Sequence, residues 1–140
     1  MNLSYLPYAL LALVSYTLVA PLTKLATRDL SSDVVAMVTN GMLAVAALVV
    51  VLATNESVTD ALAHPDARYM YAAGAFLAVG ILAYYRALAL GPVSVVVPVF
   101  GLFLVTSSLV GVVALDEPLT TRKGLGVLLA LVAVYLVTVE

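Results

Sequence analysis

The sequence contains no cysteine, one histidine and very few charged residues. Without cysteine the chain can form neither a disulfide nor a thiolate metal site. The lone His64 cannot make a histidine-pair metal site within one chain, and its polar surroundings indicate a solvated side chain. Only 6 residues are Lys or Arg and they form no cluster, so a basic surface for binding nucleic acid is lacking. We therefore expect no metal, no cofactor and no nucleic-acid partner.

The scarcity of charge also indicates the solvent of this chain. Charged residues make up 10% of its 140 residues, whereas about 25% is usual in a soluble domain. Hydrophobic residues make up 64%, and the mean hydropathy is +1.17. A soluble domain of this size has too much surface for its volume to bury so many apolar side chains. The composition predicts a multi-pass integral membrane protein, which we expect in the cell membrane with the lipid bilayer around it.

Five apolar segments could cross a membrane. A spanning helix needs about 20 mostly apolar residues to cross the roughly 30 Å of hydrocarbon in a bilayer. The segments that reach or approach this length are residues 5–26, 34–54, 69–90, 93–115 and 122–139. They predict an all-α integral membrane protein whose single domain, residues 1–140, is a bundle of five spanning helices. The first segment follows no Lys or Arg and exceeds the usual length of a signal peptide, so we interpret it as a retained span.

The residues between the spans carry signals that begin and end helices. Ser31, Ser32 and Asp33 offer side-chain oxygens that can cap the second span. Gly91 and Pro92 form a tight break, because glycine permits unusual backbone angles and proline cannot continue a helix. We therefore expect the third and fourth spans to form an antiparallel hairpin.

The basic residues are divided evenly between the two sides of the membrane. Five crossings put the termini on opposite sides, which we call side A (the side of the N-terminus) and side B. Side A receives Arg68, Arg122 and Lys123, and side B receives Lys24, Arg28 and Arg86. Orientation normally follows an excess of Lys and Arg in the cytoplasmic loops, and here neither side has one. Either a partner or the lipid decides the orientation, or the chain inserts both ways round and forms an inverted pair, as in many transporters.

Several polar side chains lie inside the predicted spans. Our candidates for the wall of a substrate cavity are Tyr16, Asn40, Tyr84, Thr106 and Ser107. The hydroxyls of Ser and Thr could instead bond to their own helix or join neighbouring helices, and the tyrosines could equally pack in a core. Asn40 is more informative, because its own helix cannot fully satisfy its amide. We expect Asn40 to face another helix or a cavity.

Two basic residues and two prolines suggest how such a cavity could open. Lys24 and Arg86 lie near span ends on side B, where charged tips usually extend to the headgroups. If both turned inward, they would form a positive cavity mouth suited to anionic or zwitterionic substrates. Pro21 and Pro98 lie inside spans, where a missing backbone hydrogen bond tends to kink the helix. We take these prolines as kink candidates, although such kinks can be merely architectural.

Every carboxylate lies in a loop or at a helix end, and none lies inside the first span. The small four-helix multidrug exporters carry an acid there to exchange protons for cations, so we do not expect a member of that family. Glu117, at the end of the fourth span, could respond to protons or pair with Arg122 or Lys123, and ion pairing is the favoured role. No nucleophile–base or acid pair lies within plausible reach inside the membrane, so we expect no catalytic residue and no enzyme.

The second half of the chain carries a family resemblance. Residues 85–94 read YRALALGPVS, residues 97–99 read VPV, and a long apolar helix then ends in LDEPLT at 115–120, before Gly124. An Ala-Leu motif, an early Pro, a closing Glu and an opening Gly follow in this order and spacing in the EamA domain of the drug/metabolite transporter superfamily, which this chain resembles. The first half is similar more loosely. Tyr16 stands near a family Trp, Lys24 stands for a Lys, and Asn40 stands where the family often has Arg.

The resemblance implies a half-size transporter. Typical members have ten helices, arranged as two five-helix domains in inverted orientation around a central cavity, and they move small metabolites such as amino acids, often in export. This chain supplies one such domain, so it would need a second copy, as an antiparallel homodimer, or a similar half, as a heterodimer. Small polar metabolites would then cross by alternating access. The alternative is a non-transporting membrane subunit or assembly partner, in which Asn40 and the deep tyrosines face another protein.

Overall fold

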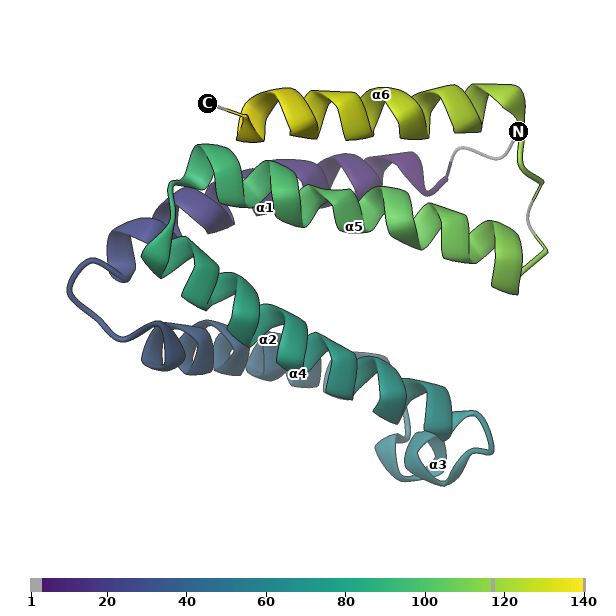
Figure 1. Ribbon diagram of the computed structural model, residues 1–140. Coiled ribbons are helices and arrows are strands. Elements are labelled where there is room, and N and C mark those ends of the chain that lie inside the picture. Colours follow the sequence, from purple (N-terminus) through teal and green to yellow (C-terminus); the bar gives the residue numbers. More distant parts are fainter. Residues whose placement is uncertain (1–3, 117, 140) are drawn as a thin grey trace. The chain divides into compact units, whose positions relative to one another are not determined.

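The computed structural model describes residues 4–116 and 118–139, and its regular structure is entirely helical within those ranges (Figure 1). The helices are α1 (Leu6–Ala26), α2 (Ser32–Thr54), α3 (Val58–Ala63), α4 (Ala67–Leu90), α5 (Val93–Ala114) and α6 (Thr121–Thr138). Among these described helices, five are long and apolar enough to cross a membrane, and only α3 is not. The prediction of an all-α membrane protein with five spans is confirmed.

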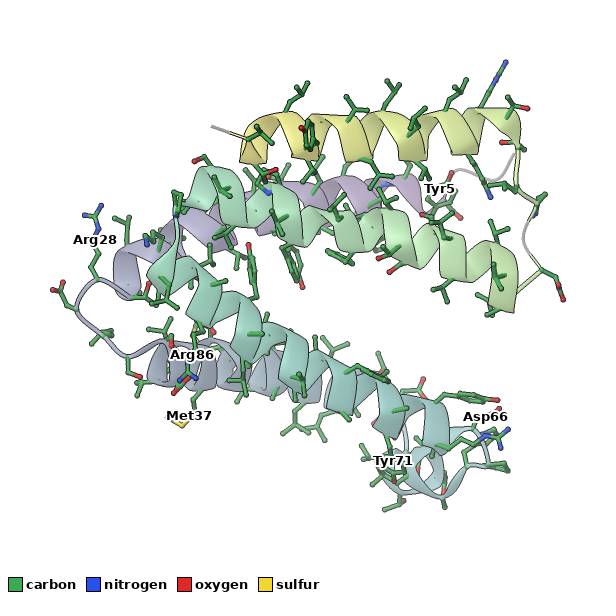
Figure 2. All side chains as sticks on the ribbon, in the orientation of Figure 1. Tyr5, Arg28, Met37, Asp66, Tyr71 and Arg86 are labelled. Atoms are coloured by element: carbon green, nitrogen blue, oxygen red, sulfur yellow. The ribbon has the colours of Figure 1, made fainter. Side chains whose placement is uncertain are left out.

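The short helix α3 lies in the stretch that the sequence indicated as a polar loop. It begins after Ser57, whose side-chain oxygen accepts a hydrogen bond from the backbone N–H of Asp60 at 3.3 Å. With 6 residues it is far too short to span a bilayer. The Tyr71 hydroxyl donates a hydrogen bond to the Leu62 carbonyl at 3.2 Å, which holds α3 against the start of α4 (Figure 2).

The helix ends follow local chemistry. The side-chain oxygen of Ser31 accepts a hydrogen bond from the backbone N–H of Asp33 and so caps α2, and Thr120 caps α6 in the same manner. Asn55 ends α2 with φ at 55°, a left-handed conformation that asparagine tolerates better than most residues. Gly91 and Pro92 separate α4 from α5. The antiparallel pairing of those two spans stays a prediction.

The first of two compact units comprises Met1–Leu90, and in it α4 packs against both α1 and α2. Two polar contacts give the direction of the helices. Lys24 Nζ donates a hydrogen bond to the Ala89 carbonyl, and Arg86 Nη2 donates one to Asp33 Oδ2, each at 3.1 Å. The C-terminal ends of α1 and α4 therefore meet the N-terminal end of α2, as successive membrane crossings require.

A small core lies at that end of the first unit. Its buried residues are Ala20 and Thr23 of α1, Val35 and Ala36 of α2, and Tyr85 and Leu88 of α4. Small side chains on α1 and α2 allow α4 to pack close to each of these helices, as is common between membrane helices. The largest side chain of this core is Tyr85, which packs with Val35 and Ala36.

The second unit comprises Gly91–Glu140, in which α5 and α6 pack against each other. Among the described residues of these two helices, only Gly111 is buried. Pro98 lies inside α5, as Pro21 lies inside α1, and each helix continues through its proline. A kink at either proline stays a prediction.

Most large apolar side chains in both units are exposed on the isolated chain. Phe76 of α4 is 79% exposed and Val113 of α5 is 82% exposed. In water such a surface would be an aggregation liability, whereas in a bilayer apolar side chains are what a helix must present to lipid. The exposed spans are therefore consistent with lipid or partner helices around this chain.

Candidate functional site

A cavity of about 490 Å³ opens between α1, α2 and α4 in the first unit. Its polar lining residues are Ser15, Tyr16, Thr23, Thr39, Asn40 and Tyr85, and its apolar lining residues are Val19, Leu22, Ala26, Val35, Leu43 and Ile81. A mostly apolar wall with a few polar groups is typical of a site for a small molecule. Among the described residues, no charged side chain lines this cavity.

The structure places two of the five candidate wall residues, Tyr16 and Asn40, at this cavity. Tyr16 is 72% exposed, so its ring is available at the open side. Asn40 is half-buried, and its Nδ2 donates a hydrogen bond to the Ala36 carbonyl at 2.8 Å. Asn40 also lines a neighbouring cavity of about 450 Å³ between α2 and α4, where Ala44, Gly74 and Ala78 are further lining residues.

The neighbours Tyr84 and Tyr85 take different places. Tyr85 is 4% exposed and lines the cavity, whereas Tyr84, the residue proposed from the sequence, packs at the side of the core and is absent from the cavity wall. Their rings meet edge to face, with centroids 6.4 Å apart. Successive residues of α4 point about 100° apart, so Tyr84 and Tyr85 face different directions, and the packing of α4 decides which of them lines the cavity.

Tyr85 makes the central polar contact between α4 and α2. Its hydroxyl lies 2.8 Å from the hydroxyl oxygen of Thr39. Thr39 Oγ1 also lies 2.9 Å from the Val35 carbonyl and 3.3 Å from the Ala36 carbonyl, within its own helix. Thr39 and Tyr85 are not among the five wall candidates, although Tyr85 is one of the deep tyrosines that the sequence offers for lining a pathway, and the structure brings the two together.

Lys24 and Arg86 both lie at the end of the first unit where the core is, and each has a partner. Lys24, in the last turn of α1, bonds to the backbone of the last turn of α4, which carries partial negative charge. Arg86 forms an ion pair with Asp33 at 3.1 Å, with its side chain 65% exposed (Figure 2). Asp33 also lies in the first turn of α2, where a carboxylate favours the helix N-terminus. The partner Asp33 was not foreseen for Arg86.

The remaining candidates belong to the second unit or lie outside the described residues. The Thr106 hydroxyl donates to carbonyls of its own helix, Leu102 at 3.3 Å and Phe103 at 3.1 Å, and Ser107 is exposed on α5. A cavity of about 400 Å³ between α5 and α6 is lined by Ser108 and Lys123 rather than by these two residues. Glu117 lies outside the described residues.

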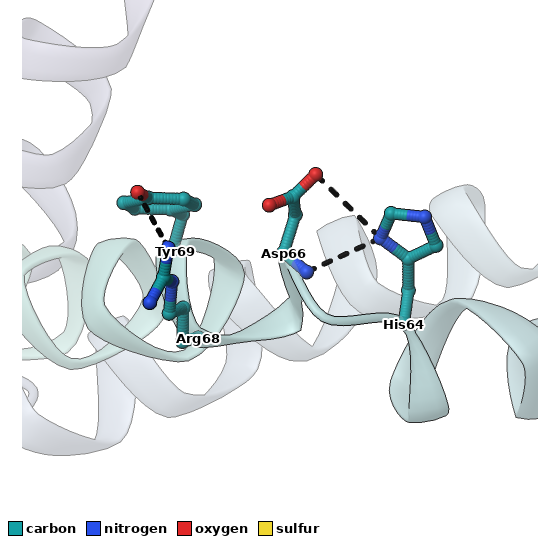
Figure 3. Close-up of polar contacts among 4 residues, drawn as sticks. All are labelled: His64, Asp66, Arg68 and Tyr69. Atoms are coloured by element: carbon teal, nitrogen blue, oxygen red, sulfur yellow. Dashed lines mark hydrogen bonds and ion pairs between the residues drawn. The ribbon is translucent and has the colours of Figure 1, made fainter.

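The loop around α3 has polar contacts of its own (Figure 3). His64 Nδ1 accepts a hydrogen bond from the backbone N–H of Asp66 at 3.2 Å and lies 3.7 Å from Asp66 Oδ2. The Arg68 guanidinium lies over the Tyr69 ring, 4.8 Å from its centroid. In the part of the chain that the structure describes, no cluster of histidine, aspartate and glutamate could hold a metal ion.

Comparison with known proteins identifies a family. The model of the EamA-like transporter family matches residues 3–139, nearly the full length of the chain. No curated protein and no solved structure matches it.

Proposed function

Because the chain belongs to the EamA-like transporter family, we propose that it is a transporter subunit that moves small polar metabolites across the cell membrane. Family membership makes it a transporter-type integral membrane protein, which takes small molecules from one side of a lipid bilayer to the other. The observation that supports a polar metabolite is the cavity between α1, α2 and α4, whose wall combines an apolar surface with hydroxyl and amide groups.

We assign the proposed roles as follows. Tyr16 of α1 and Asn40 of α2 contact the substrate, while Lys24 of α1 and Arg86 of α4 lie at the side-B end of the first unit. Thr106 and Ser107 provide polar groups on α5 of the second unit, and Tyr84 supports the core beside the cavity of the first unit. Bends at Pro21 and Pro98 allow the helix ends to rock during alternating access.

The chain acts as one five-helix domain, residues 1–140, that pairs with a second domain. Two features support pairing. The spans leave most of their apolar side chains exposed, so one copy encloses little by itself. The basic residues are also balanced between the two sides, three against three, which favours insertion in both orientations. We propose an antiparallel homodimer, with a heterodimer of similar halves as the competing arrangement.

The transport proposal is tested with purified chain in liposomes. Counterflow of radiolabelled L-serine, L-alanine, L-threonine and D-ribose should show saturable entry for at least one solute. Asn40→Leu should lower that flux about tenfold, as expected for one lost polar contact of about 1 to 1.5 kcal/mol. Met42→Leu is the matched control, because Met42 lies on the same helix and is 68% exposed outside the cavity wall.

The outcomes separate the proposed functions. Saturable flux that Asn40→Leu lowers and Met42→Leu does not supports a transporter with this site. A pure chain that gives no saturable flux for any solute, while it folds and inserts normally, indicates instead a non-transporting membrane subunit. A tag on each terminus then reports the orientation of the chain in the membrane. A single orientation in every molecule excludes the antiparallel homodimer.

A further inference from the structure

The distances determine which hydroxyl is the donor in the hydrogen bond between Tyr85 and Thr39. Thr39 Oγ1 lies 2.9 Å from the Val35 carbonyl, which can only accept, and 2.8 Å from the Tyr85 hydroxyl. A threonine hydroxyl has a single hydrogen to donate. If that hydrogen pointed to Tyr85, two acceptor oxygens would face each other at 2.9 Å without a proton between them. Thr39 therefore donates to Val35, and the Tyr85 phenol donates to Thr39.

With its hydrogen committed to Thr39, the Tyr85 oxygen can only accept further hydrogen bonds. Tyr85 lines the cavity although 4% of its surface is exposed, so its ring cannot turn without disturbing the packing against Val35 and Ala36. A buried phenol held in this way presents a lone pair of fixed direction. Thr39 is the positioning residue for that lone pair.

Asn40 adds a second acceptor next to the first. Its Nδ2 lies 2.8 Å from the Ala36 carbonyl, which can only accept, so this contact assigns the amide nitrogen to that side. Within the described residues, Asn40 Oδ1 takes part in no hydrogen bond. Since Asn40 follows Thr39 directly on α2 and lines the same cavity, Asn40 Oδ1 and Tyr85 Oη are two acceptors in one apolar wall.

We propose that Tyr85 Oη and Asn40 Oδ1 form a substrate subsite that accepts hydrogen bonds from an uncharged donor group, either a hydroxyl or an amide N–H. The described lining of this cavity contains no charged side chain, and Asp33, which lines the neighbouring cavity with Asn40, is paired with Arg86, so a cationic group would lose its hydration there without an unpaired counter-charge. This assignment rests on the proposed transport function and deepens it. The proposed substrate is a small solute of no net charge, and the subsite recognises its hydroxyl or amide group.

The transport test uses pairs of solutes that differ by one hydroxyl group, namely L-serine with L-alanine, L-threonine with L-2-aminobutyrate, and D-ribose with 2-deoxy-D-ribose. In liposomes containing the full chain, we expect a preference of about tenfold for the hydroxylated member of at least one pair. Tyr85→Phe keeps the ring in the core and removes the oxygen, so the preference should fall close to one. Tyr135→Phe is the matched control, because Tyr135 lies on α6 and is 64% exposed, and it should keep the preference.

Thr39 variants test the positioning role. Thr39→Val removes the acceptor for the phenol hydrogen, so the Tyr85 hydroxyl becomes a donor toward the cavity and the preference should fall although Tyr85 remains. Thr39→Ser keeps the hydroxyl and should restore the preference. A merely structural role for Thr39 would predict the same flux loss for both members of a pair, with the preference unchanged.

A spectroscopic measurement tests the hydrogen-bond direction without any substrate. The ultraviolet resonance Raman difference between wild type and Tyr85→Phe isolates the tyrosine doublet, which distinguishes a donating phenol from an accepting one. We expect a donating phenol in the wild type and a changed doublet in Thr39→Val. An accepting phenol in the wild type would overturn the inference, and so would saturable flux with a preference that Tyr85→Phe leaves unchanged or that no pair shows. Absence of all saturable flux would instead contradict the proposed transport function.

Discussion

At the scale of single residues, the ion pair between Arg86 and Asp33 joins the last turns of α4 to the first turn of α2. Both side chains are more than half exposed, at 65% and 59%, so solvent screens much of the attraction. Each residue also has a favourable position of its own, because Asp33 lies at a helix N-terminus and Arg86 lies near a helix C-terminus. Each residue therefore contributes to stability in two ways, through the ion pair and through its position at a helix end.

A double-mutant cycle separates these contributions. We expect Asp33→Asn and Arg86→Gln each to lower the free energy of unfolding by about 0.5 to 1 kcal/mol, and the double variant to lose less than the sum by about 0.2 to 1 kcal/mol. Thermal unfolding in detergent, followed by circular dichroism, measures the four proteins. Losses that add fully would show that the two side chains do not interact in the folded protein.

At the scale of the helices, α1 contains two prolines in different positions. Pro7 lies in the first turn, where a backbone N–H has no partner within the helix. Pro21 lies in the interior, and its missing N–H leaves the Thr17 carbonyl without its usual helical partner. The bend expected at Pro21 would therefore come from one lost hydrogen bond next to the buried Ala20 and Thr23.

Replacing each of these prolines with alanine tests the role of α1 in transport. Pro21→Ala restores the backbone hydrogen bond, so we expect a gain in stability of about 1 to 3 kcal/mol and a slower flux through a stiffer helix. Pro7→Ala is the matched control and should change both quantities little. Unfolding in detergent and counterflow in liposomes measure them. If Pro21→Ala transports at the wild-type rate, the rocking of α1 does not depend on a bend at this proline.

At the scale of the whole molecule, the even division of basic residues is the feature from which the antiparallel homodimer was proposed. The balance can be shifted in either direction at exposed loop positions. Glu56→Lys with Ala61→Lys adds two basic residues on side A, and Asp29→Lys with Leu30→Lys adds two on side B. Each pair makes the count five against three and leaves the cavity wall untouched.

Each biased variant should insert in one orientation, and the two should insert in opposite orientations. Expressed alone, each should lose most transport, because an antiparallel pair needs both orientations. Expressed together, they should recover it. Tags on the termini report the orientation, and uptake into cells reports the activity. Full activity of one biased variant in a single orientation would contradict the antiparallel homodimer.

Much of this protein follows from the sequence alone. Hydropathy is a sum over neighbouring residues, so the five spans, the membrane environment and the family motifs could be found without tertiary structure. Helix capping is equally local, which is why the cap before α2 could be foreseen among Ser31, Ser32 and Asp33. These features need only the order of the residues.

The inward face of each helix was decided by the tertiary structure. In a soluble helix the apolar stripe marks the core, but lipid is as apolar as a protein core, so these spans are apolar on every side and show no such stripe. That is why Tyr84 was selected where Tyr85 lines the cavity. The partners Thr39 for Tyr85 and Asp33 for Arg86 depend on the packing of α2 against α4, which brings together residues about fifty positions apart.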